Sequence, residues 1–132
     1  MPAEVSILLI EDDPDDIMFL KEAFTDNGLK VKMEILTKGD QINKYLGENH
    51  PLPGLIIMDL NLPKLHGREI LCLIRENPGY NEVPIAILTT SSLEEDIRYC
   101  MDHGADRYFS KPASPDEYSV VVRELYHMAT NG

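Results

Sequence analysis

The sequence predicts an α/β fold, a doubly wound (βα)5 arrangement in which helices cover both faces of a five-stranded parallel sheet. Apolar runs of strand length alternate with amphipathic helical patterns along the 132 residues. The runs at 5–10 and 55–60 are apolar at nearly every position, as expected for strands that are buried on both faces. We therefore expect one domain, residues 1–132, with no separate output domain.

The expected strands are short apolar runs bounded by polar or turn-forming residues. They lie at residues 5–10, 31–36, 55–60, 84–89 and 106–110. The helical patterns that follow them are carried by Ile17, Leu20 and Phe24; Ile42, Tyr45 and Leu46; Ile70, Leu71 and Ile74; Ile97 and Met101; and Val121, Leu125 and Met128. Because one helix follows each strand, consecutive strands can run parallel.

Several helix boundaries are marked by residues with known capping preferences. Asp13 followed by Pro14 fits an N-cap and a first helical residue. Gly28 and Gly104 fit the residues just beyond a helix C-terminus. The segments with the spacing of capping boxes are Ser92–Glu95 and Ser114–Glu117.

The charge balance argues against nucleic acid and anionic membranes as partners. With 12 basic and 23 acidic residues, the formal net charge is −11. No apolar run approaches the roughly 20 residues that span a bilayer, and the N-terminal sequence lacks the basic start of a secretory signal. We expect a cytoplasmic protein whose Cys72 and Cys100 are buried, reduced thiols.

Chemically useful side chains cluster where the expected strands end. Glu11 and Asp12 follow the first strand, and Asp59 lies near the end of the third. Thr89 ends the fourth strand, and Lys111 follows the fifth. In an open parallel sheet, functional groups gather beyond the carboxyl ends of the strands, so these side chains are expected to form one site.

The remaining acids of the segment EDDPDD have a simpler explanation. Asp13, Asp15 and Asp16 fall at the beginning of the first expected helix, where the helix dipole favours negative charge. We assign them to the helix and not to the site.

Three carboxylates at close range would repel one another unless a cation joined them. If the first and third strands are neighbours, each like-charged pair at about 4 Å costs about 4 kcal/mol at an effective dielectric constant of 20. Mg²⁺ suits a site that offers a few carboxylates and leaves positions for water and a phosphoryl oxygen. We expect Asp12 and Asp59 to be metal ligands, with Glu11 acting through water.

The same groups could support phosphoryl transfer. A carboxylate beside Mg²⁺ can attack phosphorus to form an acyl phosphate, and Asp59 is the best placed to do so. The charge on the three equatorial oxygens must then be neutralised, which Mg²⁺, Lys111 and the Thr89 hydroxyl could do.

Four segments match a known family in order and spacing: LLIEDDP, IIMDLNLPKLHG, PIAILTTSS and GADRYFSKP. Over essentially its whole length the chain resembles the response-regulator receiver domains of two-component signalling. The resemblance implies the receiver topology, which is flavodoxin-like with strand order 2-1-3-4-5.

The resemblance also implies the residues of the metal site. Asp59 corresponds to the phospho-acceptor, and Glu11 and Asp12 correspond to the acidic pair that holds Mg²⁺. Asn61 corresponds to the residue whose backbone carbonyl completes the metal shell. Mn²⁺ or Ca²⁺ are expected to substitute for Mg²⁺.

A switch is implied as well, since Thr89, Lys111 and Tyr108 occupy the family's switch positions. After phosphorylation of Asp59, Thr89 is expected to bond the new oxygens while Tyr108 moves inward. The surface of the fourth helix, fifth strand and fifth helix would change and could pair two copies as a homodimer. Its expected interface residues are Ile97, Met101, Tyr108, Phe109 and Tyr118, although Phe109 is also a candidate for simple packing.

The implied partners are a sensor histidine kinase and either a downstream protein target or a phosphotransfer protein. The segments IEDDPDDIMFLKEAF and ILTTSSLEEDI resemble stand-alone receivers that accompany phytochrome-type kinases. No enzyme activity beyond slow self-dephosphorylation is expected. One departure from many relatives is Leu65-His66 before Gly67, in a loop that borders the site.

Three other functions fit the sequence less well. A haloacid-dehalogenase-type phosphatase would carry a second aspartate where this chain has Asn61. The acids after the first strand would repel a flavin phosphate, and they lack the glycine and terminal glutamate of an EF-hand loop. The alternative that stays open is a receiver-like adaptor that binds its partner independently of phosphorylation.

Overall fold

The computed structural model describes residues 4–62 and 65–131. Its elements in chain order are β1 (Val5–Ile10), α1 (Pro14–Asp26), β2 (Val31–Leu36), α2 (Gln41–Gly47), β3 (Leu55–Met58), α3 (Gly67–Glu76), β4 (Ile85–Thr89), α4 (Glu94–Asp102), β5 (Arg107–Ser110) and α5 (Pro115–Asn131). The five strands form one sheet in the order β2-β1-β3-β4-β5, and all neighbouring pairs are parallel. The predicted fold class and strand order are confirmed.

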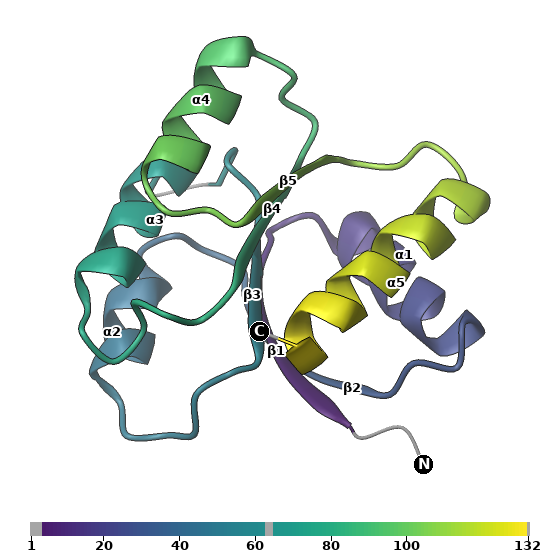
Figure 1. Cartoon of the computed structure of the whole chain (residues 1–132), viewed down its shortest axis with the longest axis horizontal. Coiled ribbons are helices and arrows are strands. Elements are labelled where there is room, and N and C mark those ends of the chain that lie inside the picture. The colour runs from purple at the N-terminus through teal and green to yellow at the C-terminus, as the bar shows by residue number, and fades with distance from the viewer. Residues whose placement is uncertain (1–3, 63–64, 132) are drawn as a thin grey trace.

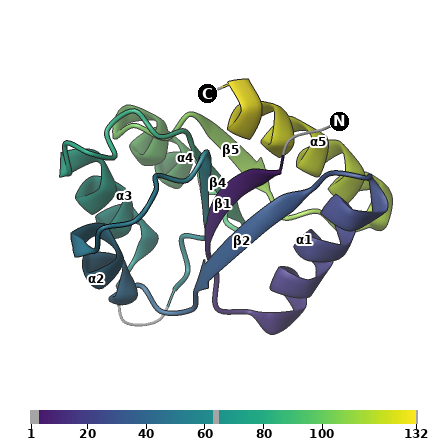
Figure 2. The same cartoon turned by 90° about the horizontal axis from the view of Figure 1, so that it is seen from below.

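Helices cover both faces of the sheet (Figures 1 and 2). Helices α1 and α5 lie together on one face, and α2, α3 and α4 lie on the other. Successive side chains of a strand point to opposite faces, which explains why β1 is apolar almost throughout. Ile7 and Leu9 pack on the side of α1 and α5, whereas Leu8 and Ile10 pack on the side of α2 and α3.

Each face has its own apolar core. On the α1/α5 side, Phe24 and Leu125 are almost completely buried against the strands. On the opposite side, Ile42, Ile70 and Ile74 do the same. Burying one such side chain stabilises the fold by about 1.5–3 kcal/mol, so the two cores hold the sheet and its carboxyl edge in place.

Local chemistry explains the helix ends that were predicted correctly. The Asp13 carboxylate accepts backbone hydrogen bonds from Asp15 and Asp16, at 2.9 and 3.4 Å, and caps α1. Gly28 and Gly104 have φ of 69° and 105°, in the left-handed region that only glycine adopts without strain.

The predicted capping box at Ser92–Glu95 is wrong. Helix α4 begins at Glu94, Leu93 occupies the N-cap position, and no side chain caps the helix. At the start of α5, Ser114 Oγ does accept a hydrogen bond from the Glu117 amide at 3.2 Å. The Glu117 carboxylate, however, accepts from the amide of Ala113 instead of the amide of Ser114.

Three strands are shorter than predicted. β3 ends at Met58, β4 starts at Ile85 and β5 starts at Arg107. Asp59 therefore lies one residue beyond its strand, although its amide still donates to the Ile10 carbonyl at 3.1 Å. Within residues 4–62 and 65–131, no helix is long and apolar enough to cross a membrane.

Candidate functional site

The carboxyl edge of the sheet brings the predicted acids together. Glu11 follows β1, and Asp59 follows the neighbouring strand β3. Carboxylate oxygens of Glu11, Asp12 and Asp59 all lie within 4.8 Å of one another. Glu11 and Asp59 are buried, whereas Asp12 is exposed. The site is therefore a concentration of negative charge in which Asp12 is open to water.

Lys111 partly balances this charge. Its Nζ lies 2.8 Å from Glu11 Oε1, 2.7 Å from Asp16 Oδ2 and 2.9 Å from Asp59 Oδ2, and its side chain is only 9% exposed. Burial by itself would lower the pKa of the ammonium group, but the hydrogen bonds to the three carboxylates outweigh burial and raise the pKa. Lys111 is therefore held charged.

Both carboxylate oxygens of Glu11 are engaged. Oε1 binds Lys111, and Oε2 accepts from the amides of Asp12 and Asp13 at 3.1 and 3.2 Å. Burial and the nearby Asp59 charge raise the pKa of Glu11, while the bonds to Lys111 and the Asp13 amide oppose that rise. Glu11 therefore holds Lys111 and the start of the β1–α1 loop in place, and neither of its carboxylate oxygens is free of a partner.

Asp59 is held from two sides. Oδ2 accepts from Lys111, and Oδ1 accepts from the amide of Asn61 at 3.3 Å. Asn61 is exposed and follows Asp59 by two residues, so its backbone borders the acids. The role of its carbonyl as a metal ligand stays a prediction.

The donor set fits a hard divalent cation. Mg²⁺ binds oxygen at 2.0–2.1 Å, so two of its ligands can be no more than about 4.2 Å apart. The ligand atoms of the three acids lie within 4.8 Å of one another, close to this limit. Two of them can bind the ion directly if the third is linked through water, and Glu11, whose oxygens are already engaged, suits that third position.

Thr89 and Tyr108 both contact Ser91, in the loop between β4 and α4. Thr89 is fully buried, and its Oγ1 accepts from the Ser91 amide at 3.4 Å. The Tyr108 hydroxyl donates to the Ser91 carbonyl at 2.8 Å, and burial raises the pKa of Tyr108. One loop residue therefore connects two of the three predicted switch positions.

The same loop is tied to α3 and α4. Ser91 Oγ donates to Asp96 Oδ2 at 2.6 Å, and the Arg68 guanidinium donates to Asp96 Oδ1. Arg68 also lies over the ring of Tyr99, 4.6 Å from its centre. The bonds from Ser91 and Arg68 lower the pKa of Asp96. The sequence analysis did not find this α3–α4 connection, because nothing local pairs residues 68 and 96.

The loop after Asp59 packs closely at both ends. An added Cβ at Gly67 would lie 2.5 Å from Leu60 Cα and 2.8 Å from the Asp59 carbonyl oxygen. Leu65 packs against Gly39, where a Cβ would lie 2.4 Å from the Leu65 carbonyl oxygen. His66 caps α3, since its Nδ1 accepts from the Arg68 amide at 3.1 Å. Leu65 and His66 thus place this loop, and the histidine cap was not predicted.

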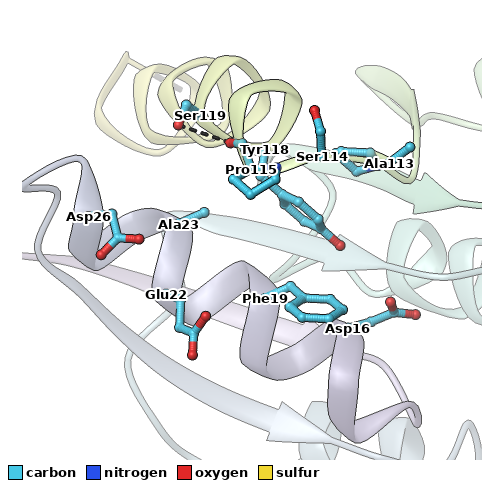
Figure 3. Close-up of a pocket in the computed structure, with 11 residues that line it drawn as sticks. Asp16, Phe19, Glu22, Ala23, Asp26, Ala113, Ser114, Pro115, Tyr118 and Ser119 are labelled. Carbon is cyan, nitrogen blue, oxygen red and sulfur yellow. Dashed lines mark hydrogen bonds between the residues drawn. The ribbon is translucent and has the colours of Figure 1, made fainter.

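A groove runs between α1 and the start of α5 (Figure 3). It has a volume of about 270 Å³, and Phe19 and Tyr118 face each other in it with ring centres 6.1 Å apart. Asp16 lies at one end of the groove and Asp26 at the other. Glu22 lies between these two acids, so the groove combines two aromatic rings with three carboxylates, and its Asp16 end adjoins the Lys111 cluster.

The residues expected to form an interface do not share one environment. Met101 is 44% exposed, and Ile97 and Tyr108 are half-buried. Phe109 and Tyr118 are only 8% and 7% exposed and belong to the core on the α1/α5 side. Burial in that core leaves these two residues little free surface for a partner, and their role in an interface stays a prediction. For Phe109 the structure supports the packing alternative.

Asp16 is the site residue that the sequence analysis missed. It was assigned to the helix dipole, and it does lie in the first turn of α1. It also contacts Lys111, 95 residues away. The available signal was periodicity: Asp16 precedes buried Leu20 by four residues, so both lie on the inward face of α1.

The fold and the site define an α/β protein with an open parallel sheet whose carboxyl edge combines an acidic trio, a buried threonine and a lysine held by carboxylates. The family model described as the response regulator receiver domain matches residues 7–123. The chain belongs to this family, as its motifs predicted.

Two curated relatives illustrate the similarity. Response regulator Rcp1 of Synechocystis sp. is 36% identical over 110 residues, which are 80% of this chain and 75% of Rcp1. The probable methanogenesis regulatory protein FilR2 of Methanothrix harundinacea is 32% identical over 123 residues, which are 90% of this chain and 79% of FilR2.

Solved structures agree with the sequence relationship. The phosphorylated cyanobacterial phytochrome response regulator RcpA matches with a TM-score of 0.86 at 32% identity, covering 97% of this chain and 95% of that one. The Mn²⁺-bound form of Rcp1 matches with a TM-score of 0.81 at 30% identity, covering 92% and 91%. The receiver topology is thus shared by these two response regulators and this chain.

Proposed function

We propose that this protein is a response regulator that accepts a phosphoryl group from a sensor histidine kinase on Asp59. The observation that carries the proposal is the contact of 2.9 Å between Lys111 Nζ and Asp59 Oδ2, beside the acidic trio of Glu11, Asp12 and Asp59. This buried carboxylate is paired with a lysine and flanked by further acids. Such an arrangement suits phosphoryl transfer at the edge of the sheet.

In the proposed reaction, Asp59 attacks phosphorus through a carboxylate oxygen. The bond from phosphorus to the imidazole nitrogen of the kinase breaks as the bond from phosphorus to the Asp59 oxygen forms. Lys111 neutralises one equatorial oxygen, and the Thr89 hydroxyl donates to a second. Asp12 and Asp59 would hold Mg²⁺ directly and Glu11 would hold it through water, and the ion would supply further positive charge; Mn²⁺ or Ca²⁺ could replace it.

The proposed output runs through Ser91. In this structure the Thr89 hydroxyl accepts a hydrogen bond from the Ser91 amide. When Thr89 turns toward the new phosphoryl oxygens, that hydrogen bond breaks. The Tyr108 hydroxyl is bound to the carbonyl of the same residue, so Tyr108 responds to the displaced loop. The surface of α4, β5 and α5 then changes, with Ile97, Met101 and Tyr108 as the residues available to a partner or a second copy.

The proposed setting is a cytoplasmic phosphorelay in which this chain acts as a stand-alone receiver. Similarity to the cyanobacterial phytochrome response regulator RcpA supports a phytochrome-type kinase as the donor. The phosphorylated form would signal to a downstream protein or pass the group to a phosphotransfer protein. The protein would lack turnover beyond slow self-dephosphorylation.

The test is phosphorylation of the purified protein by acetyl phosphate in Mg²⁺, read by intact mass. We expect one phosphoryl adduct on the unmodified chain and on Asp40→Asn, an exposed acid used as control, and none on Asp59→Asn. An adduct that persists on Asp59→Asn would refute the assignment. Failure with acetyl phosphate and with a cognate kinase would favour the phosphorylation-independent adaptor.

A second variant tests the output. Lys111→Ala should still bind Mg²⁺ but should lose the change in sedimentation or partner affinity that phosphorylation causes in the unmodified protein. An unaltered response in this variant would remove Lys111 from the proposed mechanism.

A further inference from the structure

Asp16 contributes a fourth carboxylate to the site, from a helix and not from a strand end. Its Oδ2 lies 2.7 Å from Lys111 Nζ, as near as the oxygens of Glu11 and Asp59 at 2.8 and 2.9 Å. Its side chain is 25% exposed, whereas those of Glu11 and Asp59 are 5% and 6% exposed. Figure 3 shows it at the end of the groove between α1 and α5.

The bonding capacity of Lys111 is already filled. An ammonium group has three N–H donors and no acceptor, and the three donors are matched by three carboxylates in this structure. Phosphorylation replaces the Asp59 carboxylate by an acyl phosphate, and the charged phosphoryl oxygens then compete with Glu11 and Asp16 for the same three donors.

Asp16 is the partner that withdraws at least cost. Releasing a carboxylate is expensive when it stays buried and cheap when water replaces the lost bond. Asp16 is the most exposed of the three acids and borders the open groove, whereas Glu11 is held by two further backbone amides.

We propose that Asp16 is a positioning residue that competes with the phosphoryl group for the Lys111 ammonium. The inference rests on the proposed function of Asp59 as acceptor. In the resting protein Asp16 keeps Lys111 occupied; on phosphorylation it gives the ammonium up to a phosphoryl oxygen. Its negative charge also opposes the arriving phosphoryl charge. Asp16 thereby sets how readily the site accepts and keeps that group.

The test compares Asp16→Asn with Asp15→Asn in binding beryllofluoride, a phosphoryl mimic, at Mg²⁺ concentrations that saturate each variant. Asp15→Asn is a matched control, because Asp15 lies in the same helical turn as Asp16 and the substitution removes the same charge. Asp15 is exposed, and none of its described interactions involves Lys111. Calorimetry gives the affinity, and circular dichroism verifies that each variant is folded.

We expect Asp16→Asn to bind beryllofluoride about tenfold more tightly than the unmodified protein, the size expected for releasing one charge-assisted hydrogen bond in a partly exposed site. Asp15→Asn should stay within about twofold, since its charge is further from the ligand and screened by water. Asp16→Glu, which keeps a carboxylate in reach of Lys111, should return the affinity toward that of the unmodified protein.

Equal or weaker binding by Asp16→Asn would overturn the inference, and so would an equal gain in Asp15→Asn. If Asp16→Asn does not fold, Asp16→Ser gives the same comparison without the amide. If the unmodified protein itself fails to bind beryllofluoride, the proposed function falls and the inference falls with it. Binding that is normal but indifferent to residue 16 overturns the inference alone.

Discussion

Replacing Lys111 with methionine should destabilise the fold and make its stability depend on Mg²⁺. The substitution keeps an unbranched apolar side chain in the same space but removes the ammonium from three carboxylates at 2.7–2.9 Å. Removing one partner of a buried ion pair costs about 3–5 kcal/mol. This is a large part of the roughly 5–15 kcal/mol that stabilises a domain of this size.

The stability of Lys111→Met should also depend more strongly on Mg²⁺ than that of the unmodified protein. Without Lys111, the acids that remain repel one another and should bind a divalent cation more strongly than before. Added Mg²⁺ should therefore raise the unfolding free energy of Lys111→Met more than that of the unmodified protein, through binding to the folded state alone.

The assay is urea unfolding followed by circular dichroism, with and without Mg²⁺. Lys44→Met, at an exposed position of α2, is the control and should stay within about 0.5 kcal/mol of the unmodified protein. A loss below about 1 kcal/mol for Lys111→Met in the absence of Mg²⁺, or no extra stabilisation by Mg²⁺, would refute the view that Lys111 is the counter-charge of the site.

Two further predictions concern the loops. Gly67→Ala should lower the unfolding free energy by about 1–3 kcal/mol, because its Cβ would collide with the backbone of the turn after β3; Gly47→Ala, whose Cβ would meet nothing within 4 Å, should not, and equal effects in urea unfolding would refute the clash. His50 contacts the carbonyls of Pro51 and Tyr45 through its two ring nitrogens, at 3.0 and 2.9 Å, and these bonds raise its pKa from 6.5. A raised pKa in the folded state means that the His50 contribution is complete below pH 6.5 and is lost as pH rises through the folded value; the stability difference from His50→Gln should shrink over that range, and a constant difference would contradict it.

The parts of the fold set by local chemistry could be predicted from the sequence. Pro14 has no amide hydrogen to lose at a first helical position, and Asp13 before it supplies the cap that α1 needs. Gly104 accepts the left-handed conformation that ends α4. The strand ends then fix where Glu11 and Asp59 must lie, because parallel strands present their carboxyl ends at one edge.

The missed features depend on contacts between distant segments. Ser92 has the spacing of a capping residue, but it does not cap α4. The hydroxyl of the neighbouring Ser91 donates to Asp96 instead, and this contact forms only in the folded chain. Asp16 already had a sufficient local explanation in the helix dipole, so its bond to Lys111 was invisible until α1 and the β5–α5 loop were placed together. Phe109 lies between half-buried Tyr108 and exposed Ser110 in a short strand, and its ring is buried by contacts with distant segments that include α5.

Ser91 also determines how the β4–α4 loop can open. Its amide, carbonyl and hydroxyl bind Thr89, Tyr108 and Asp96, respectively, so the loop cannot peel away one bond at a time without leaving polar groups unpaired. Such a residue makes opening cooperative, and the loop, the edge strand β5 and the first turn of α4 should fluctuate as one unit on one timescale. In native-state hydrogen exchange, the amides of these three segments would then share a single opening free energy instead of a graded series.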